Sequence, residues 1–183
     1  MRMKPEIKVL PDGRECTIRS AGIRDAERMC EHERITAQET DFILLTPAET
    51  EKNRRAMAQR LSLRAAAGDR ITLCAFVGDE LAGTATVSPY GELMRVAHRC
   101  TMSIALKRKY WGSGIADALM EYVTDFGQKI GYRSIELSVD AANLRAIALY
   151  ERFGFRRCGS IEGGLRHSDG SLSDEVTMFR LLE

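Results

Sequence analysis

Two glycines before a predicted helix form the segment of this chain best suited to bind an anion. Gly112-Ser113-Gly114 lies between an apolar extended run ending at Leu106 and a run with helical periodicity. Glycines let a ligand approach the backbone closely, and the N–H groups and dipole of a helix N-terminus favour negative charge. The segment therefore predicts a pyrophosphate site, with a tight strand-to-helix turn as the structural alternative.

Three basic residues, Lys107, Arg108 and Lys109, stand just before this turn. They are placed to neutralise phosphates, and the alternative is a solvated run of charge without function. The formal net charge of the chain is only +1, so an anion site must be local and not the product of a long-range field. The same balance argues against binding of nucleic acid or a membrane surface.

Two nucleotide-binding patterns do not fit the turn. A Walker loop requires Gly-Lys-Ser/Thr, whereas Gly114 is followed by Ile115 and Ala116. A Rossmann fingerprint requires a third glycine or alanine where Asp117 stands, in a first βαβ unit followed by a full parallel sheet. The remainder of this chain contains a hairpin instead, so a nicotinamide-dependent enzyme is retained only if the predicted fold is wrong.

Hydrophobic periodicity and turn residues predict the elements that hold this turn. Strands are predicted at 16–19, 71–77, 81–88, 96–106, 134–139, from Phe155 onward and at 172–182, with turns at Gly78-Asp79 and Asp169-Gly170. Helices are predicted from Asp25, from a capping box at 46–49 to about Ala67, at 112–131 and at 143–153. The order predicts one domain over residues 1–183 of the α+β, or mixed α/β, class, in which a crossover helix makes 96–106 and 134–139 parallel neighbours.

Two motifs resemble those of a known family. Residues 106–116, LKRKYWGSGIA, resemble the acetyl-CoA signature Gln/Arg-x-x-Gly-x-Gly/Ala of the GNAT superfamily of N-acetyltransferases, with Lys109 replacing the usual Gln or Arg. Residues 139–155, VDAANLRAIALYERFGF, are similar to the family's second segment, Asn-x-x-Ala-x-x-Leu-Tyr-x-x-x-Gly-Phe. The resemblance covers nearly the whole chain, and it is closest to the bacterial branch that contains spermidine acetyltransferases and ribosomal-protein N-terminal acetyltransferases.

The resemblance implies a central mixed, mostly antiparallel sheet of about seven strands flanked by about four helices, with acetyl-CoA as cosubstrate and no metal. The strands ending at Leu106 and Val139 would splay apart around the cosubstrate. Residues 104–106 would pair with the pantetheine arm, residues 111–117 would bind the pyrophosphate, and Asn143 would contact the arm. By matching positions, the cofactor-binding residues are Ile104, Ala105, Leu106, Lys109, Trp111, Gly112, Ser113, Gly114, Ile115, Ala116, Asp117 and Asn143. Trp111 departs from the common Arg or Gln, which leaves part of the phosphate binding to backbone amides and the basic connector.

Acetyl transfer to an amine requires a neutral amine, stabilisation of a tetrahedral oxyanion and a proton for the departing thiolate, whose pKa is about 8.5. Tyr150 matches the family's tyrosine and is the predicted proton donor, with a core aromatic as the alternative. A backbone N–H near residues 104–106 is predicted to hold the oxyanion.

The sequence leaves several candidates for the general base, which must deprotonate an ammonium with a pKa of about 10.4. Many relatives carry Glu where this chain has Thr101. Glu136 is the predicted catalytic base, and Glu92 and His98 are the other candidates; each has an alternative as a surface or strand residue. Cys100 is not predicted to be a nucleophile, because no His stands beside it and the family transfers acetyl directly.

Glu39 and Asp41 lie where relatives place substrate-contacting loops, so they are predicted to attract a cationic amine, with a solvated loop as the alternative. The predicted function is acetyl-CoA-dependent transfer to a primary amine of a small molecule, such as a polyamine, an amino acid or an analogue, by direct attack in a ternary complex. A ribosomal-protein or peptide N-terminal acetyltransferase and a non-catalytic acyl-CoA sensor are the alternatives. The resemblance does not name the amine and leaves a homodimer open.

Composition predicts a cytoplasmic protein. The hydrophobic fraction of 44% suits a globular core in a chain of 183 residues. The first ten residues carry charges at Arg2, Lys4, Glu6 and Lys8 and lack the apolar core of a secretory signal, and no run approaches the roughly 20 apolar residues of a membrane span. The five cysteines show no CxxC spacing, so neither a disulfide framework nor a zinc site is indicated.

Overall fold

A computed structural model describes residues 3–182, and the chain forms two compact units. The first unit comprises Met1–Ser88 and Ser103–Val123, and the second comprises Pro89–Met102 and Thr124–Glu183. Strand β5 (Arg99–Leu106) and helix α3 (Ile115–Ile130) run from one unit into the other. Met1, Arg2 and Glu183 lie outside the described residues, and one domain over residues 1–183 stays a prediction.

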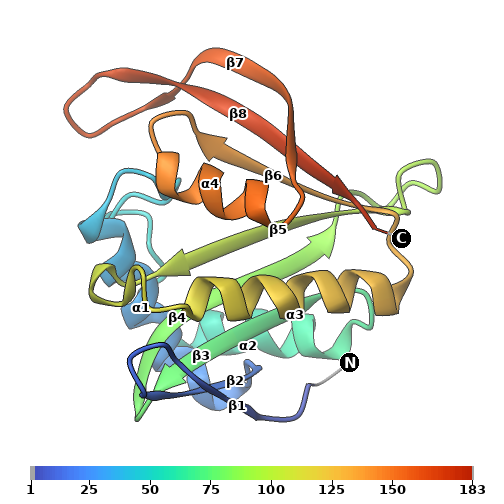
Figure 1. Cartoon of the computed structure of the whole chain (residues 1–183). Helices are drawn as coiled ribbons and strands as arrows, with labels where there is room; N and C mark the ends of the chain where they lie inside the picture. The colour runs from blue at the N-terminus through green and yellow to red at the C-terminus, as the bar shows by residue number, and fades with distance from the viewer. Residues whose placement is uncertain (1–2, 183) are drawn as a thin grey trace. The chain divides into compact units, whose positions relative to one another are not determined.

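The first unit is built on antiparallel strands that pair in chain order (Figure 1). They are β1 (Glu6–Val9), β2 (Glu15–Ser20), β3 (Ile71–Val77) and β4 (Glu80–Pro89), and the end of β5 follows beside β4. The predicted turn at Gly78-Asp79 joins β3 to β4, with Gly78 at a φ of 58°. A Cβ on Gly83 would come within 2.9 Å of Leu106 Cγ, so the missing side chain lets β5 pack closely against β4.

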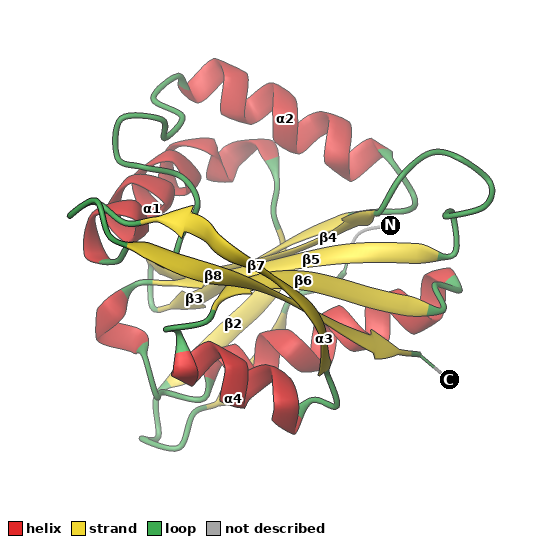
Figure 2. Ribbon diagram, turned by 90° about the horizontal axis from the view of Figure 1, so that it is seen from above, coloured by secondary structure: helices red, strands yellow, loops and turns green. Residues whose placement is uncertain are grey.

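Helices cover both faces of these strands. Figure 2 shows α1 (Ala26–Glu39) and α2 (Arg54–Ala66) on one face and the first half of α3 on the other. Residues of α1, α2, β3 and β4 form one buried cluster beneath the first pair of helices, including Met29, Met57, Leu61, Phe76 and Leu81. On the opposite face, Ile115, Leu119 and Val123 of α3 are fully buried and recur at the spacing of one helical face, which fits the helix predicted over 112–131.

The start predicted for the second helix is wrong. Thr46 and Glu49 do interact, but both Thr46 donors, N–H and Oγ1, bond to Glu49 Oε2 at 2.9 and 2.7 Å, and this segment forms a turn. The helix begins at Arg54 instead, where Asn53 Oδ1 accepts the N–H groups of Arg55 and Ala56. The Asn cap supplies what a helix start requires, acceptors for otherwise unpaired N–H groups.

The second unit contains β6 (Ser134–Asp140), α4 (Leu144–Arg152), β7 (Arg156–Arg166) and β8 (Leu172–Leu181). Strand β8 lies between β6 and β7 and is antiparallel to both, while the first residues of β5 pair with β6 in parallel. The second half of α3 packs tightly here, since a Cβ on Gly127 would meet Leu182 at 2.8 Å and Ile135 at 3.2 Å. The predicted turn at Asp169-Gly170 joins β7 to β8, with Gly170 at a φ of 86°.

The predicted fold class is confirmed. Over residues 3–182 the structure has four α-helices and eight strands, in the sheet order β1-β2-β3-β4-β5-β6-β8-β7, mixed and mostly antiparallel. The strand missing from the prediction is β1, a four-residue edge strand that is largely exposed and so lacks an apolar pattern. Within the same residues no helix has the length and apolar character needed to cross a membrane.

Candidate active site

The predicted pyrophosphate segment forms a compact turn in the first unit. Gly112 and Gly114 adopt φ values of 75° and 86°, a left-handed conformation that favours glycine. Ser113 is held by its N–H and Oγ, which donate to the carbonyl of Tyr110 at 3.3 and 2.6 Å. Helix α3 starts directly afterwards at Ile115, so the N–H groups of its first turn lie at the end of the glycine segment. This geometry suits a diphosphate.

Strand β5 leads into the turn through half-buried residues 104–106. The register of β5 with β6 ends at Thr101 opposite Glu136, so in the described chain residues 104–106 lie beyond that ladder. Trp111 donates its indole N–H to the carbonyl of Leu106 at 3.0 Å. The residue that departs from the family pattern therefore ties the turn to the end of the strand.

The basic connector is engaged with acidic side chains. Nζ of Lys107 and Nζ of Lys109 lie 2.9 and 2.6 Å from the two oxygens of Glu80, and the Tyr110 hydroxyl donates to Oε2 at 2.9 Å. Burial would raise the pKa of Glu80, but the hydrogen bonds from Lys109, Lys107 and Tyr110 outweigh it and lower that pKa to about 2. Two of the three predicted phosphate-facing cations thus hold the turn against β4, and Lys109 as a cofactor contact stays a prediction.

This cluster predicts a stability change in acid. A carboxyl group whose pKa is lower in the folded chain than in the unfolded chain stabilises the fold at pH values above its ordinary pKa of 4.5. This stabilisation is lost as the pH falls towards 2. We expect Glu80→Gln to lower the urea midpoint at pH 7, with the gap to wild type closing between about pH 4.5 and 2. Glu162→Gln on exposed β7 is the control. If the difference in urea midpoint between wild type and Glu80→Gln stays constant from pH 7 to 2, the ionised Glu80 carboxylate does not stabilise the fold through these contacts.

Glu39 contacts the connector. Its Oε2 accepts the backbone N–H of Arg108 at 2.6 Å, and its carbonyl accepts the Arg108 guanidinium. The end of α1 is thereby joined to the segment just before the glycine turn. Asp41 lies two residues further on in an exposed loop. The Glu39 carboxylate is therefore bound to a backbone N–H of the chain itself, while binding of an amine by Glu39 and Asp41 remains a prediction.

Glu136, in the second unit, is paired with an arginine. Arg99 donates from Nε and Nη2 to its two carboxylate oxygens, both at 2.5 Å, and the Arg99 guanidinium also lies 3.7 Å from the centre of the Tyr90 ring. Such a bidentate contact engages both carboxylate oxygens with one guanidinium, so neither oxygen is left without a cationic partner. The role of Glu136 as general base stays a prediction, and this geometry counts against it.

The second motif places Asn143 and Tyr150 on α4. Asn143 is the N-cap, since its Oδ1 accepts the N–H of Ala146 at 3.2 Å. Tyr150 is buried, with its ring 5.9 Å from that of Phe155, and burial raises the pKa of its hydroxyl to about 12. Tyr150 is therefore protonated at neutral pH, as a proton donor must be.

Sequence reasoning missed one pair of residues that can carry chemistry. Asp140, the last residue of β6, lies with its Oδ2 2.6 Å from Nε2 of His167, in the turn between β7 and β8. The partners stand 27 positions apart, so no local pattern links them. The only signal was the position of Asp140, three residues before Asn143.

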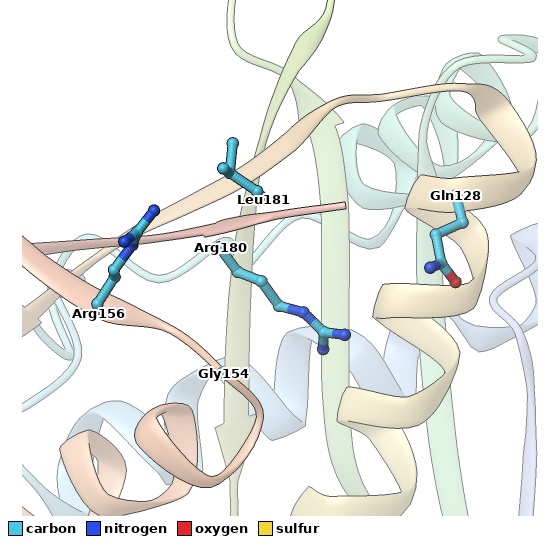
Figure 3. Close-up of a pocket in the computed structure, with 5 residues that line it drawn as sticks. All are labelled: Gln128, Gly154, Arg156, Arg180 and Leu181. Carbon is cyan, nitrogen blue, oxygen red and sulfur yellow. The ribbon is translucent and has the colours of Figure 1, made fainter. Parts of the chain in front are cut away.

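A pocket of about 450 Å³ also opens in the second unit. It is lined by Gln128, Gly154, Arg156, Arg180 and Leu181, and Figure 3 shows the Arg180 side chain extending between the Gly154 turn and the helix that carries Gln128. No predicted site residue lines it. In residues 3–182, no group of three or more His, Cys, Asp or Glu side chains is arranged to hold a metal ion.

Comparison with known families identifies the class of protein. Residues 29–155 match the sequence pattern of the acetyltransferase (GNAT) family. The match spans more than half of the chain and includes the glycine turn and Tyr150, so the chain belongs to this family. The predicted identity as a GNAT acyltransferase is confirmed. A comparison with curated proteins gives no match.

Solved structures share the fold. An acetyltransferase of the GNAT family from Streptococcus pneumoniae is 29% identical, with a TM-score of 0.86 over 91% of this chain and 99% of that one. A ribosomal-protein-alanine N-acetyltransferase from Brucella melitensis is 22% identical, with a TM-score of 0.80 over 90% and 99%. A phosphinothricin acetyltransferase from Sinorhizobium meliloti, in complex with AcCoA, is 23% identical, with a TM-score of 0.80 over 91% and 88%. At these identities the last two show likeness of fold alone.

Proposed function

We propose that this protein is a cytoplasmic, acetyl-CoA-dependent N-acetyltransferase that acetylates a primary amine of a small molecule. The observation that carries the proposal is the turn with Gly112 and Gly114 in the left-handed conformation, directly before α3. The turn combines close backbone approach with helix N–H groups, which fits a diphosphate. Family membership and the AcCoA complex of the Sinorhizobium protein support acetyl-CoA as the bearer of that diphosphate.

The residues of the candidate site then each have a role in the reaction. Acetyl-CoA supplies the thioester that the amine attacks. The backbone of residues 104–106 orients the pantetheine arm and stabilises the oxyanion, and the glycine turn holds the diphosphate. Asn143 keeps its amide N–H donors for the arm while its oxygen caps α4. Tyr150 donates a proton to the sulfur as the thiolate departs.

An assay of acceptors tests this proposal. The protein is incubated with acetyl-CoA and a panel of polyamines, amino acids and their analogues, aminoglycosides and peptide N-termini, and released thiol is measured. Thiol release with a small amine supports the proposal, and release with peptides alone would replace it by N-terminal acetylation. Acetyl-CoA binding without release for any amine would instead indicate a sensor.

A further inference from the structure

The pocket in the second unit is large enough to hold a small organic molecule. Its volume of about 450 Å³ lies within the range of roughly 300 to 1,000 Å³ that is usual for small-molecule sites. The end of α3, the turn after α4, the start of β7 and the end of β8 form its walls, through Gln128, Gly154, Arg156, Arg180 and Leu181. All of these residues belong to the second unit, and none of them comes from the glycine turn before α3.

Arg180 brings a guanidinium group to this pocket. Figure 3 shows its side chain extending between the Gly154 turn and the helix that carries Gln128. Its Nη1 donates to the Thr124 hydroxyl at 3.3 Å, a neutral partner that orients the side chain without compensating its charge. Within residues 3–182, Arg180 forms no ion pair with a carboxylate. A guanidinium presents several N–H donors in a planar fork, so donors remain for a carboxylate or a phosphate.

The charge on the walls of the pocket is positive. Arg156 borders the pocket from β7, and its guanidinium lies 4.9 Å from the centre of the Phe179 ring, a contact that does not neutralise it. No Asp or Glu is among the described residues that line the pocket. The neighbouring Arg157 differs, since its Nε lies 3.8 Å from a carboxylate oxygen of Glu151. The walls therefore favour a ligand with negative charge.

Gly154 and Leu181 determine what else the ligand contacts. Gly154 follows α4 with a φ of 78°, and a Cβ there would lie 3.7 Å from Nε of Arg180. A longer side chain at this position would extend along the guanidinium, so the glycine leaves that side of Arg180 open to a ligand. Leu181 is 58% exposed and offers apolar surface beside the cation. Such walls fit an anionic group attached to a small apolar body.

We propose that this pocket binds a small organic anion, whose carboxylate or phosphate group is held by Arg180. The guanidinium donates two parallel hydrogen bonds to the oxyanion, and Thr124 keeps the side chain oriented. Arg156 adds positive potential from the neighbouring strand. The site does not rest on the proposed acetyl transfer, because no residue with a role in that reaction is among those that line the pocket.

Titrations with inorganic phosphate and with succinate test the site, in protein saturated with CoA so that an anion cannot compete for the glycine turn. The backbone amide NMR signals of Gly154 and Leu181 report binding at the pocket itself. We expect saturable shifts of these signals at millimolar concentrations of phosphate, succinate or both. Arg180→Gln should weaken this binding by about tenfold or more, because it removes both the charge and the fork of donors. Tighter binding of phosphate than of succinate assigns a phosphate group to the ligand, and the reverse order assigns a carboxylate.

Two further variants separate anion binding from effects on the fold. Arg157→Gln is the matched control, because Arg157 stands next to Arg156 on β7 but pairs with Glu151, and it should bind both anions as wild type does. Arg180→Lys keeps the charge without the fork and should bind with intermediate strength, while thermal unfolding shows that each variant is folded. If neither anion shifts the two signals, or if a folded Arg180→Gln protein binds as tightly as wild type, the proposal is wrong, whereas the proposed acetyl transfer stands.

Discussion

Tyr150→Phe is expected to lower kcat by about 100-fold or more while leaving acetyl-CoA affinity unchanged within about twofold. The substitution removes one hydroxyl from a buried ring and leaves the ring packed against Phe155. Because burial raises the pKa of Tyr150 to about 12, the hydroxyl is protonated throughout the neutral range. A thiol has a pKa of about 8.5, so full transfer from this phenol to a free thiolate is uphill. The hydroxyl therefore donates a hydrogen bond to the charge that develops on sulfur, before any transfer of its proton.

Single-turnover thiol release and the binding of acetyl-CoA measure the two effects of Tyr150→Phe separately. Tyr132→Phe is a matched control, since Tyr132 is also 6% exposed and belongs to the same unit. We expect Tyr132→Phe to keep its turnover. If Tyr150→Phe turns over at the wild-type rate, the hydroxyl is not the donor. If it loses acetyl-CoA affinity to the same extent as kcat, the tyrosine has a structural part in the site.

Much of the fold is predictable because local chemistry determines it. Strand β3 is apolar at almost every position, and the Gly78-Asp79 turn that follows joins it to β4 as expected. The start of α2 was predicted wrongly because two segments carry cap residues, at Thr46 and at Asn53. Only the folded chain shows which of them supplies acceptors to backbone N–H groups. A short edge strand such as β1 gives no burial pattern at all.

The candidate site is predictable only in part, because the role of a charged side chain depends on the groups that it contacts in the folded chain. The glycine turn depends on local conformation and could be predicted as a turn into a helix. By contrast, Glu39 meets Arg108 across 69 positions and Glu136 meets Arg99 across 37. Such pairings depend on which strands and helices become neighbours, and no spacing rule in the sequence encodes them. A carboxylate predicted as reactive can therefore turn out to be bound to a cation of the same chain.

Gly114→Val is expected to weaken acetyl-CoA binding by about tenfold or more. At its φ of 86° Gly114 occupies a conformation that a β-branched residue adopts only with strain of about 1 to 3 kcal/mol. In addition, a Cβ there would lie 3.0 Å from Cδ of Pro11, a ring that cannot rotate out of the way. To relieve the backbone strain and the contact with Pro11, the backbone must leave its left-handed conformation. This change moves the N–H groups that we propose to hold the diphosphate. Titration with CoA measures the change in dissociation constant.

The effect of Gly114→Val on binding must be separated from its effect on stability, because backbone strain alone destabilises the fold without touching a ligand. Gly131→Val is the matched control: Gly131 has a φ of 88° at the end of α3, and a Cβ there meets no atom within 4 Å. Both variants should unfold at a lower temperature, but only Gly114→Val should weaken CoA binding. If the two variants bind CoA equally well, the diphosphate is held elsewhere and the proposed function loses its principal support. A loss specific to position 114 ties the ligand to this turn, because the two substitutions are chemically identical and both place valine at a left-handed φ; they differ in position and in the contact of the Cβ with Pro11.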